Sequence, residues 1–299
     1  MAHLNMNTTW NESCEENFNN YDCKFCNGNR CYDGKKGIII YVFTLVIICM
    51  GLPLILLAIY SLSSLVRKDH GAPVYVINLF TSDLIQLLCM IGWVAVKNNE
   101  QKLSDIFYLY YYGLLSSVGF MVCISLERYL VIAWPLWYRF RRTTKTYVVA
   151  CVLVWILPPV FFLPLYLSVG FGTTEIIFAV FLLLPLPLFI FSLGGTLKAL
   201  STSLSISSDV KRRIVAVLVV VLLIYTLLFM PTVIFVFLVQ FKVIISDDHW
   251  LASNILVQLS PLADLILYIF MRKGTTDKIL VSLCCCRMQI QESPNEQHE

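Results

Sequence analysis

Four charged side chains stand inside the long apolar segments of this 299-residue sequence: Asp83, Glu127, Arg128 and Asp264. A charge at the centre of a lipid-spanning helix costs roughly 3 kcal/mol on insertion scales, so such residues mark functional sites. Glu127 and Arg128 are neighbours near the end of an apolar run, where a long Arg side chain can reach the membrane interface. Asp83 and Asp264 lie inside their runs, where two carboxylates that share a site favour retention of one proton.

Seven apolar blocks must position these charges. The sequence is 58% hydrophobic and 14% charged, whereas soluble domains are about 25% charged. Each block approaches or exceeds the ~20 residues that span a bilayer. Their ranges are 37–62, 74–96, 106–133, 147–169, 176–197, 214–241 and 251–271. Backbone groups in lipid must be satisfied within the segment, and the blocks lack the alternation of barrel strands. The sequence therefore predicts an all-α membrane protein with a seven-transmembrane helix bundle.

The short loops predict the orientation, because cytoplasmic loops carry an excess of Lys and Arg. With the N-terminus outside, fourteen basic residues lie on the inner side and seven on the outer side. We therefore expect three parts: an extracellular tail over 1–36, a transmembrane domain over 37–271, and a cytoplasmic segment over 272–299. No apolar signal-peptide core precedes the first block. The expected location is the plasma membrane.

The N-terminal tail combines acceptor triplets for N-glycosylation at Asn7 and Asn11 with a cluster of cysteines. The four cysteines are Cys14, Cys23, Cys26 and Cys31. In an oxidising compartment they can form two disulfides in three connectivities. A zinc site is the alternative for a cytosolic tail. The predicted orientation favours disulfides.

The segment after the last block predicts a short amphipathic helix on the inner membrane surface. Its apolar residues would face lipid, and its basic residues would lie near anionic headgroups. It ends in Cys284, Cys285 and Cys286. A juxtamembrane cysteine cluster of this kind favours S-palmitoylation; free thiols are the alternative.

Several motifs together resemble the rhodopsin-like (class A) G-protein-coupled receptors over about residues 37–287. Glu127-Arg128-Tyr129 closes the third block, and Asp83 and Trp155 stand at matching places in the second and fourth. Pro185 or Pro187 fits the fifth-helix proline, Phe229-Met230-Pro231 resembles the sixth-helix switch, and Asp264 to Tyr268 resembles the seventh-helix motif. Gly51-Leu52-Pro53 is most similar to the branch with nucleotide, lipid and proton-sensing receptors.

The resemblance implies two sites at and below the centre of the bundle. A G-protein switch would comprise Glu127, Arg128, Tyr129 and Tyr268, with Arg128 held by Glu127 at rest, because an Arg fork pairs well with a carboxylate. Lys211 would face Arg128 and weaken its restraint. An ion or proton site would comprise Asp83, Ser117, Ser260 and Asp264. Sodium at Asp83, a proton, and a purely structural polar core all stay open; no other cofactor is expected.

The resemblance also implies a rotamer switch and a ligand pocket. The switch is expected at Phe229, beside Pro231, with Tyr225 and Val118 as packing partners, because proline bends a helix. The pocket would be mostly aromatic and apolar, as small-molecule sites are. Its candidate residues are Trp93, Phe107, Tyr110, Tyr111, Leu114, Thr232, Trp250, Asn254 and Gln258. A lipid or another weakly charged ligand is favoured, because the pocket offers no acid for an amine and no Arg for a phosphate.

Departures from the family pattern keep a second interpretation open. Ile55 replaces an expected Asn, Leu265 replaces the seventh-helix proline, and both cysteines of the usual outer-loop disulfide are absent. We expect a receptor that couples an outer ligand to a heterotrimeric G protein. The alternatives are a signalling-impaired decoy with the receptor fold and a proton-sensing receptor. A transporter lacks support, since neither repeats nor a charged pathway are present. An enzyme or a nucleic-acid-binding protein is not expected.

Overall fold

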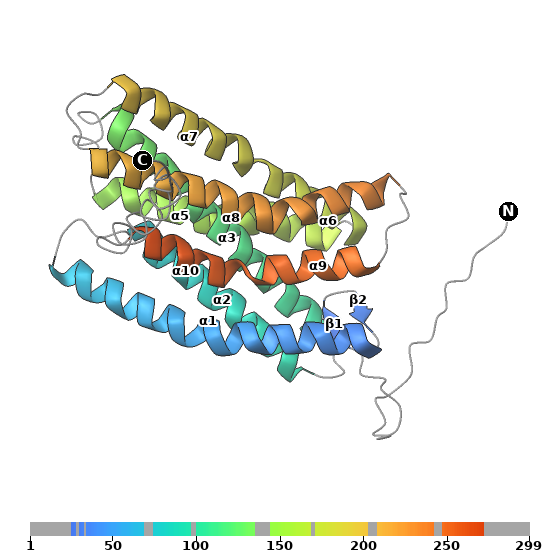
Figure 1. The fold of residues 1–299 in the computed structure, drawn as a ribbon. Coiled ribbons are helices and arrows are strands. Elements are labelled where there is room, and N and C mark those ends of the chain that lie inside the picture. Colours follow the sequence, from blue (N-terminus) through green and yellow to red (C-terminus); the bar gives the residue numbers. More distant parts are fainter. Residues whose placement is uncertain are drawn as a thin grey trace, which may run out of the picture.

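The computed structural model describes residues 25–27, 30–32, 34–68, 74–96, 100–134, 144–168, 171–202, 208–241 and 247–271. These residues form a bundle of long helices that run side by side (Figure 1). The first four helices are α1 (Gly34–Lys68), α2 (Val74–Ala95), α3 (Glu100–Ala133) and α5 (Thr144–Ser168). They are followed by α6 (Phe171–Leu183), α7 (Pro185–Thr202), α8 (Ser208–Gln240), α9 (Asp247–Gln258) and α10 (Ser260–Met271).

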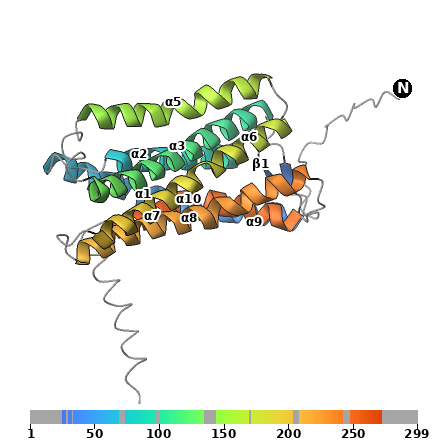
Figure 2. The same cartoon turned by 90° about the horizontal axis from the view of Figure 1, so that it is seen from above.

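The helices match the predicted membrane-spanning blocks. Among the described residues, 5 segments are long and apolar enough to cross a bilayer, and α9 with α10 forms one further broken span. Helix α5 has 25 residues, which is also a spanning length. It lies at the edge of the bundle, beside α3 (Figure 2). The predicted all-α membrane bundle is therefore confirmed.

Two of the predicted blocks are broken helices, and prolines explain both breaks. Helix α6 ends at Leu183, and α7 begins at Pro185, with Pro187 two residues later. Helices α9 and α10 meet at Leu259 with a bend of 44°, just before Pro261. Proline has no N–H to donate and its ring crowds the preceding turn, so the regular helical ladder stops there.

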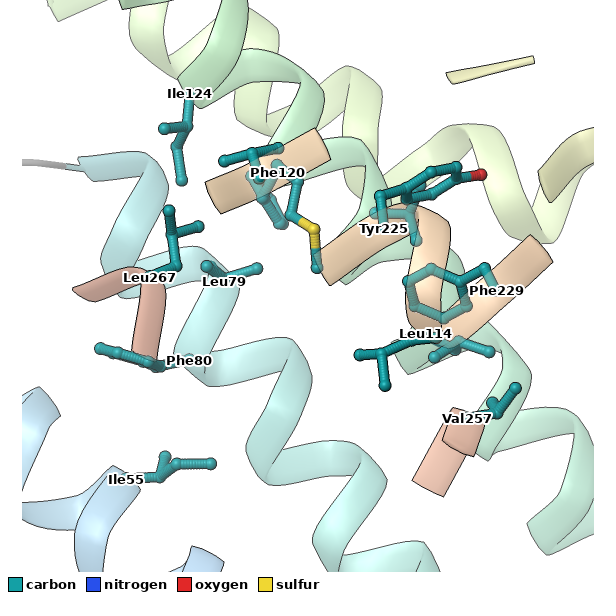
Figure 3. Close-up of a cluster of buried hydrophobic side chains, with 14 of the residues drawn as sticks. Ile55, Leu79, Phe80, Leu114, Phe120, Ile124, Tyr225, Phe229, Val257 and Leu267 are labelled. Carbon is teal, nitrogen blue, oxygen red and sulfur yellow. The ribbon is translucent and has the colours of Figure 1, made fainter. Parts of the chain in front are cut away.

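Burial in the bundle has the pattern expected of a protein solvated by lipid. Large apolar side chains point outward on α1, α5 and α7, for example Leu57 at 65% and Val149 at 58% exposure. Polar side chains are buried in the interior, among them Ser82, Asp83 and Gln86. The inner faces of α2, α3 and α8 meet in one apolar cluster, part of which is drawn in Figure 3.

A short hairpin precedes the first helix. Strands β1 (Phe25–Asn27) and β2 (Arg30–Tyr32) pair antiparallel, and both contact α1. The predicted tail residues before them lie outside the described part of the chain, and so does the predicted amphipathic helix after Met271.

Candidate functional site

The two predicted acidic residues meet in the centre of the bundle. Asp83 of α2 and Asp264 of α10 both have 0% exposure and interact through their side chains. Ser117 of α3 donates its hydroxyl to Asp264 Oδ2 at 2.9 Å. The structure thus brings Asp83, Ser117 and Asp264 together from three helices, as the sequence predicted.

Gln86 completes this group, and the sequence analysis missed it. Its amide Nε2 donates to Asp83 Oδ1 at 3.2 Å. Its Oε1 accepts a hydrogen bond from the hydroxyl of Ser260 at 2.9 Å. The predicted residue Ser260 therefore reaches Asp83 through Gln86. The available signal was a polar residue three positions after Asp83, which places it on the same helical face.

Close packing of α2 against α3 holds this polar group in place. A Cβ atom at Gly113 would meet Gln86 Cγ and the carbonyl oxygen of Ser82, each at 3.1 Å. Glycine is the residue that allows so close an approach of two helices. Gly113 therefore lets the backbone of α3 lie directly over the Gln86 side chain.

The oxygen atoms of the group are suited to one monovalent cation. Asp83 Oδ2 and Asp264 Oδ1 are buried and have no protein hydrogen-bond partner among the described residues. Carboxylate and hydroxyl oxygens are hard ligands, which an alkali cation requires. The described residues include no group of three or more His, Cys, Asp or Glu side chains that could hold a metal. A sodium ion at this site would be held by the two carboxylates and by the hydroxyl of Ser117, which contacts Asp264.

The Glu127-Arg128-Tyr129 motif lies at one end of α3, where its three side chains have different surroundings. Glu127 accepts a hydrogen bond from the hydroxyl of Tyr147 on α5 at 3.2 Å. Arg128 is half-buried and makes no hydrogen bond or ion pair in the described part of the chain. The expected restraint of Arg128 by Glu127 is therefore not made between these two described residues, because the carboxylate is directed toward α5.

Tyr129 packs against α7. Its ring lies 5.3 Å from that of Phe191, centre to centre. A Cβ atom added at Gly195 would lie 2.6 Å from Tyr129 Cε2. The ring of Tyr129 on α3 therefore occupies the space beside Gly195. The predicted switch residue Tyr268 lies elsewhere, against Phe80 of α2 at 5.5 Å between ring centres.

Two basic residues at the start of α8 bind the ends of other helices. Lys211 Nζ donates to the carbonyl oxygen of Leu200 on α7 at 3.2 Å. The guanidinium group of Arg213 donates to the carbonyl oxygen of Met271, the last residue of α10. The ammonium group of Lys211 thus contacts the end of α7, and its expected effect on Arg128 stays a prediction.

The predicted rotamer switch is buried in the apolar cluster shown in Figure 3. Phe229 has 0% exposure, and its ring centre lies 5.1 Å from that of Tyr225. Phe189 of α7 also packs against Tyr225, at 4.9 Å between ring centres. The Tyr225 hydroxyl donates to the carbonyl oxygen of Leu182 beside the α6–α7 break. Val118 belongs to the same cluster, and Pro231 lies inside α8.

Aromatic rings of the predicted ligand pocket form a continuous group over α2, α3 and α6. Trp93 and Tyr110 lie 4.7 Å apart between ring centres, and Phe107 and Tyr111 lie 4.4 Å apart. Tyr111 continues to Phe178 of α6 at 4.2 Å. Leu114 is fully buried one turn along α3 from Tyr110. Four predicted pocket aromatics and Leu114 are thus brought together.

The other predicted pocket residues make contacts between helices. Gln258 Oε1 accepts from Thr44 of α1 at 2.9 Å, and its Nε2 donates to Asn254 Oδ1 at 3.4 Å. Thr232 donates to the carbonyl oxygen of Ser253 at 3.5 Å. Trp250 packs on Phe235 of α8 at 4.7 Å between ring centres. These side chains join α9 to α1 and α8.

Trp155 of α5 is fixed by a polar contact that sequence analysis also missed. Its indole Nε1 donates to Asn78 Oδ1 of α2 at 2.9 Å, and Asn78 Nδ2 donates to the carbonyl of Val74 at the same distance. A polar residue inside an apolar block was the available signal.

The predicted modification sites fall mostly outside the described residues. These are Asn7, Asn11, Cys14, Cys23, Cys284, Cys285 and Cys286. Cys26 and Cys31 lie in the hairpin, where they are register partners. Their chemistry remains a prediction.

The sequence of this chain is similar to those of known membrane receptors. A family model described as the 7 transmembrane receptor (rhodopsin family) matches residues 56–174. A purinoceptor of Xenopus laevis is 30% identical over 131 residues, covering 42% of this chain and 24% of that protein. Lysophosphatidic acid receptor 6 of Mus musculus is 29% identical over 167 residues, covering 51% and 48%.

A third relative, Mas-related G-protein coupled receptor member X1 of Homo sapiens, is 25% identical over 132 residues, covering 42% of this chain and 39% of that protein. The matches span less than half the length of these relatives. The matched family and relatives are receptors rather than enzymes, and they support a receptor signalling function. In sequence and in its helical membrane bundle, the chain resembles the rhodopsin-like (class A) G-protein-coupled receptors.

Proposed function

We propose that this protein is a plasma-membrane receptor with its N-terminus outside the cell, and that it couples an outer ligand to a heterotrimeric G protein. The observation that carries the proposal is that the Arg128 guanidinium group is left available for a partner. Its neighbours Glu127 and Tyr129 are engaged by α5 and α7, while the half-buried Arg128 makes no hydrogen bond or ion pair to the described residues. A planar guanidinium group with five donors is suited to the carbonyls of an incoming helix.

The excess of basic residues in the loops on this side of the bundle supports a cytoplasmic position for Arg128. In this mechanism the ends of α3, α7 and α8 separate when a ligand is bound, and the G protein contacts Arg128 in the opening. A ligand can shift such an equilibrium only by its difference in affinity between the closed and open states.

Signalling in cells tests the coupling directly. Dissociation sensors for the main G-protein classes are expressed with the wild type, Arg128→Ala and Lys198→Ala, at matched surface levels. Lys198 is an exposed basic residue on α7 and serves as the control. We expect a basal signal that falls at least tenfold in Arg128→Ala and persists in Lys198→Ala. Equal signals in all three variants contradict the role of Arg128, and a wild type that couples to nothing favours the decoy.

The aromatic group supports a lipid or other weakly charged ligand. The described pocket residues supply aromatic rings, Leu114 and amide or hydroxyl groups, without a cation for phosphate. One relative is named a purinoceptor and another a lysophosphatidic acid receptor, so the probes are ATP, lysophosphatidic acid and an uncharged monoacylglycerol. We expect a response to a lipid probe that Tyr111→Ala reduces. A response to ATP alone contradicts this ligand class.

We further propose that Asp83 and Asp264 bind a single monovalent cation, either Na⁺ or a proton. Each carboxylate has one oxygen that accepts from a neighbour and one that has no protein partner among the described residues. Two negative charges in so small a buried site are unfavourable, and one positive charge between them relieves the repulsion. The closed state holds Asp83 and Asp264 together, so a cation bound between them would stabilise that state.

A further inference from the structure

The first two turns of α8 carry a run of three basic residues, Lys211, Arg212 and Arg213. Positive charge at a helix N-terminus is unfavourable for that helix, because its own dipole is positive there. The run therefore gains its stabilisation from groups outside α8. Two of its members find such groups on two other helices.

The acceptors are carbonyl groups at helix C-termini. Leu200 lies in the last turn of α7, and Met271 is the last residue of α10. The last four carbonyls of a helix have no intrahelical donor, and they form the negative end of its dipole. Lys211 and Arg213 donate to the Leu200 and Met271 oxygens, respectively. Each contact therefore pairs a positively charged donor with a carbonyl oxygen at the negative end of a helix.

The spacing of the two residues directs them to opposite sides of α8. Residues two positions apart are separated by about 200° around a helix. Lys211 can therefore reach α7 while Arg213 reaches α10, and both helices pack against α8. Arg212, between them, is exposed. The end of α8 is held from two sides at once.

We propose that Lys211 and Arg213 are positioning residues that form a carbonyl clamp, which keeps this end of α8 closed against α7 and α10 at rest. The clamp replaces the expected restraint between Glu127 and Arg128. Release of either contact lowers the free energy needed for α8 to move away. Its consequence for signalling rests on the proposed function, whereas its effect on the position of α8 does not.

A distance measurement on purified protein tests the clamp without any G protein. Spin labels are attached through unnatural amino acids at Arg212 of α8 and Lys145 of α5, which are both exposed. The same labels are used with Lys211→Gln, Arg213→Gln and the charge-matched control Lys198→Gln. A hydrogen bond from a charged donor is strong enough that its loss should raise the ratio of open to closed molecules roughly tenfold. Lys198→Gln should keep the closed distance, and Lys211→Arg should retain it.

The distance measurement tests the clamp independently of the proposed coupling to a G protein. Unchanged distances in both glutamine variants overturn the clamp. Longer distances without G-protein dissociation in cells support the clamp and contradict the proposed coupling. If one glutamine variant does not fold, the other decides, because either contact alone is expected to matter. With Arg213→Gln, faster reaction of Lys211 with an amine reagent gives an independent readout, and an unchanged rate counts against the clamp.

Discussion

Tyr110 donates its phenol hydroxyl to the carbonyl oxygen of Val257 at 3.4 Å, across the space between α3 and α9. This carbonyl stands four residues before Pro261, which has no N–H to complete the helical bond. Both residues are buried. The aromatic group of α3 thus supplies the donor that the proline of α10 removes, and the bend before Asp264 is tied to the predicted ligand pocket.

Replacement of Tyr110 by Phe should destabilise the protein by about 1 kcal/mol, because the Val257 carbonyl loses its donor. Thermal unfolding of the purified protein in detergent measures this, with an expected fall in Tm of about 2–4 °C. Tyr112→Phe is the control, since Tyr112 stacks on Trp155 through its ring. In a Pro261→Ala background the N–H returns, so the loss caused by Tyr110→Phe should shrink. An equal loss in both backgrounds refutes the link.

Two adjacent glycines of α7 offer a matched pair of substitutions. A Cβ atom at Gly195 would lie 2.6 Å from the ring of Tyr129, whereas one at Gly194 would meet nothing within 4 Å among the described residues. We expect Gly195→Ala to cost about 1–3 kcal/mol through overpacking. Gly194→Ala should be neutral or stabilising by up to about 1 kcal/mol, because alanine favours the helix.

A double-mutant cycle isolates the contact between Gly195 and Tyr129. With Tyr129→Ala in place, the ring that crowds the added methyl group is gone. The cost of Gly195→Ala should then largely disappear, and the coupling should amount to about 1 kcal/mol or more. Denaturation of the four proteins measures it. Additive effects would show that α7 is crowded by something other than Tyr129.

Sequence patterns predicted most of the helical framework, because apolar length is the property that a bilayer selects. They did not predict the breaks at Leu184 and Leu259, although Pro185 and Pro261 were visible. A proline inside a membrane helix either bends it or is accommodated by its neighbours, and tertiary contacts such as Tyr110 with Val257 decide between these outcomes.

The acidic pair was predictable because charges in apolar blocks are rare, but its hydrogen bonds were not. Gln86 is hydrogen-bonded to Ser260, which is 174 residues away in sequence, and Tyr147 to Glu127, which is 20 residues away. The partner of Lys211 was not predicted for a related reason. A charge pattern indicates which cations lie at the membrane boundary, yet the acceptor here is a backbone carbonyl, which every residue possesses.

The proposed cation of Asp83 and Asp264 can be identified by stability measurements. Binding to the folded state alone raises stability with ligand concentration. Sodium predicts a higher Tm in NaCl than in an equal concentration of choline chloride at constant pH. A proton predicts a rise in Tm as the pH falls from about 8 to about 6, independent of sodium, because the folded state then binds more protons than the unfolded state.

Asp264→Asn is the control for both cations, since its neutral amide removes the repulsion and supplies a donor toward Asp83. Its Tm should depend much less on sodium and on pH than that of the wild type. Ser63→Ala, at an exposed position of α1, should leave both dependences intact. A wild type that responds to neither ion would leave the pair with a structural role alone.

The hairpin register gives a prediction for the cysteines of the tail. Cys26 and Cys31 are Cα partners across β1 and β2, and residues directly opposite in an antiparallel pair have Cα atoms about 4.5–5.5 Å apart. This separation lies within the range of disulfides, about 4.4–6.8 Å. Of the three connectivities, we therefore expect the one that joins Cys26 to Cys31. Two thiols would be oxidised by exchange with a protein disulfide of the secretory pathway, which is reduced to a dithiol.

Trypsin distinguishes this connectivity from the other two. Cleavage after Lys24, Arg30 and Lys35 separates the peptides 1–24, 25–30 and 31–35, which carry Cys14 with Cys23, Cys26, and Cys31 respectively. A Cys26–Cys31 bond leaves peptide 1–24 alone and joins the other two. Either alternative connectivity links all three peptides into one species. Mass spectrometry without reduction, after glycan removal, reads the result, and four alkylated free thiols would exclude disulfides from the tail altogether.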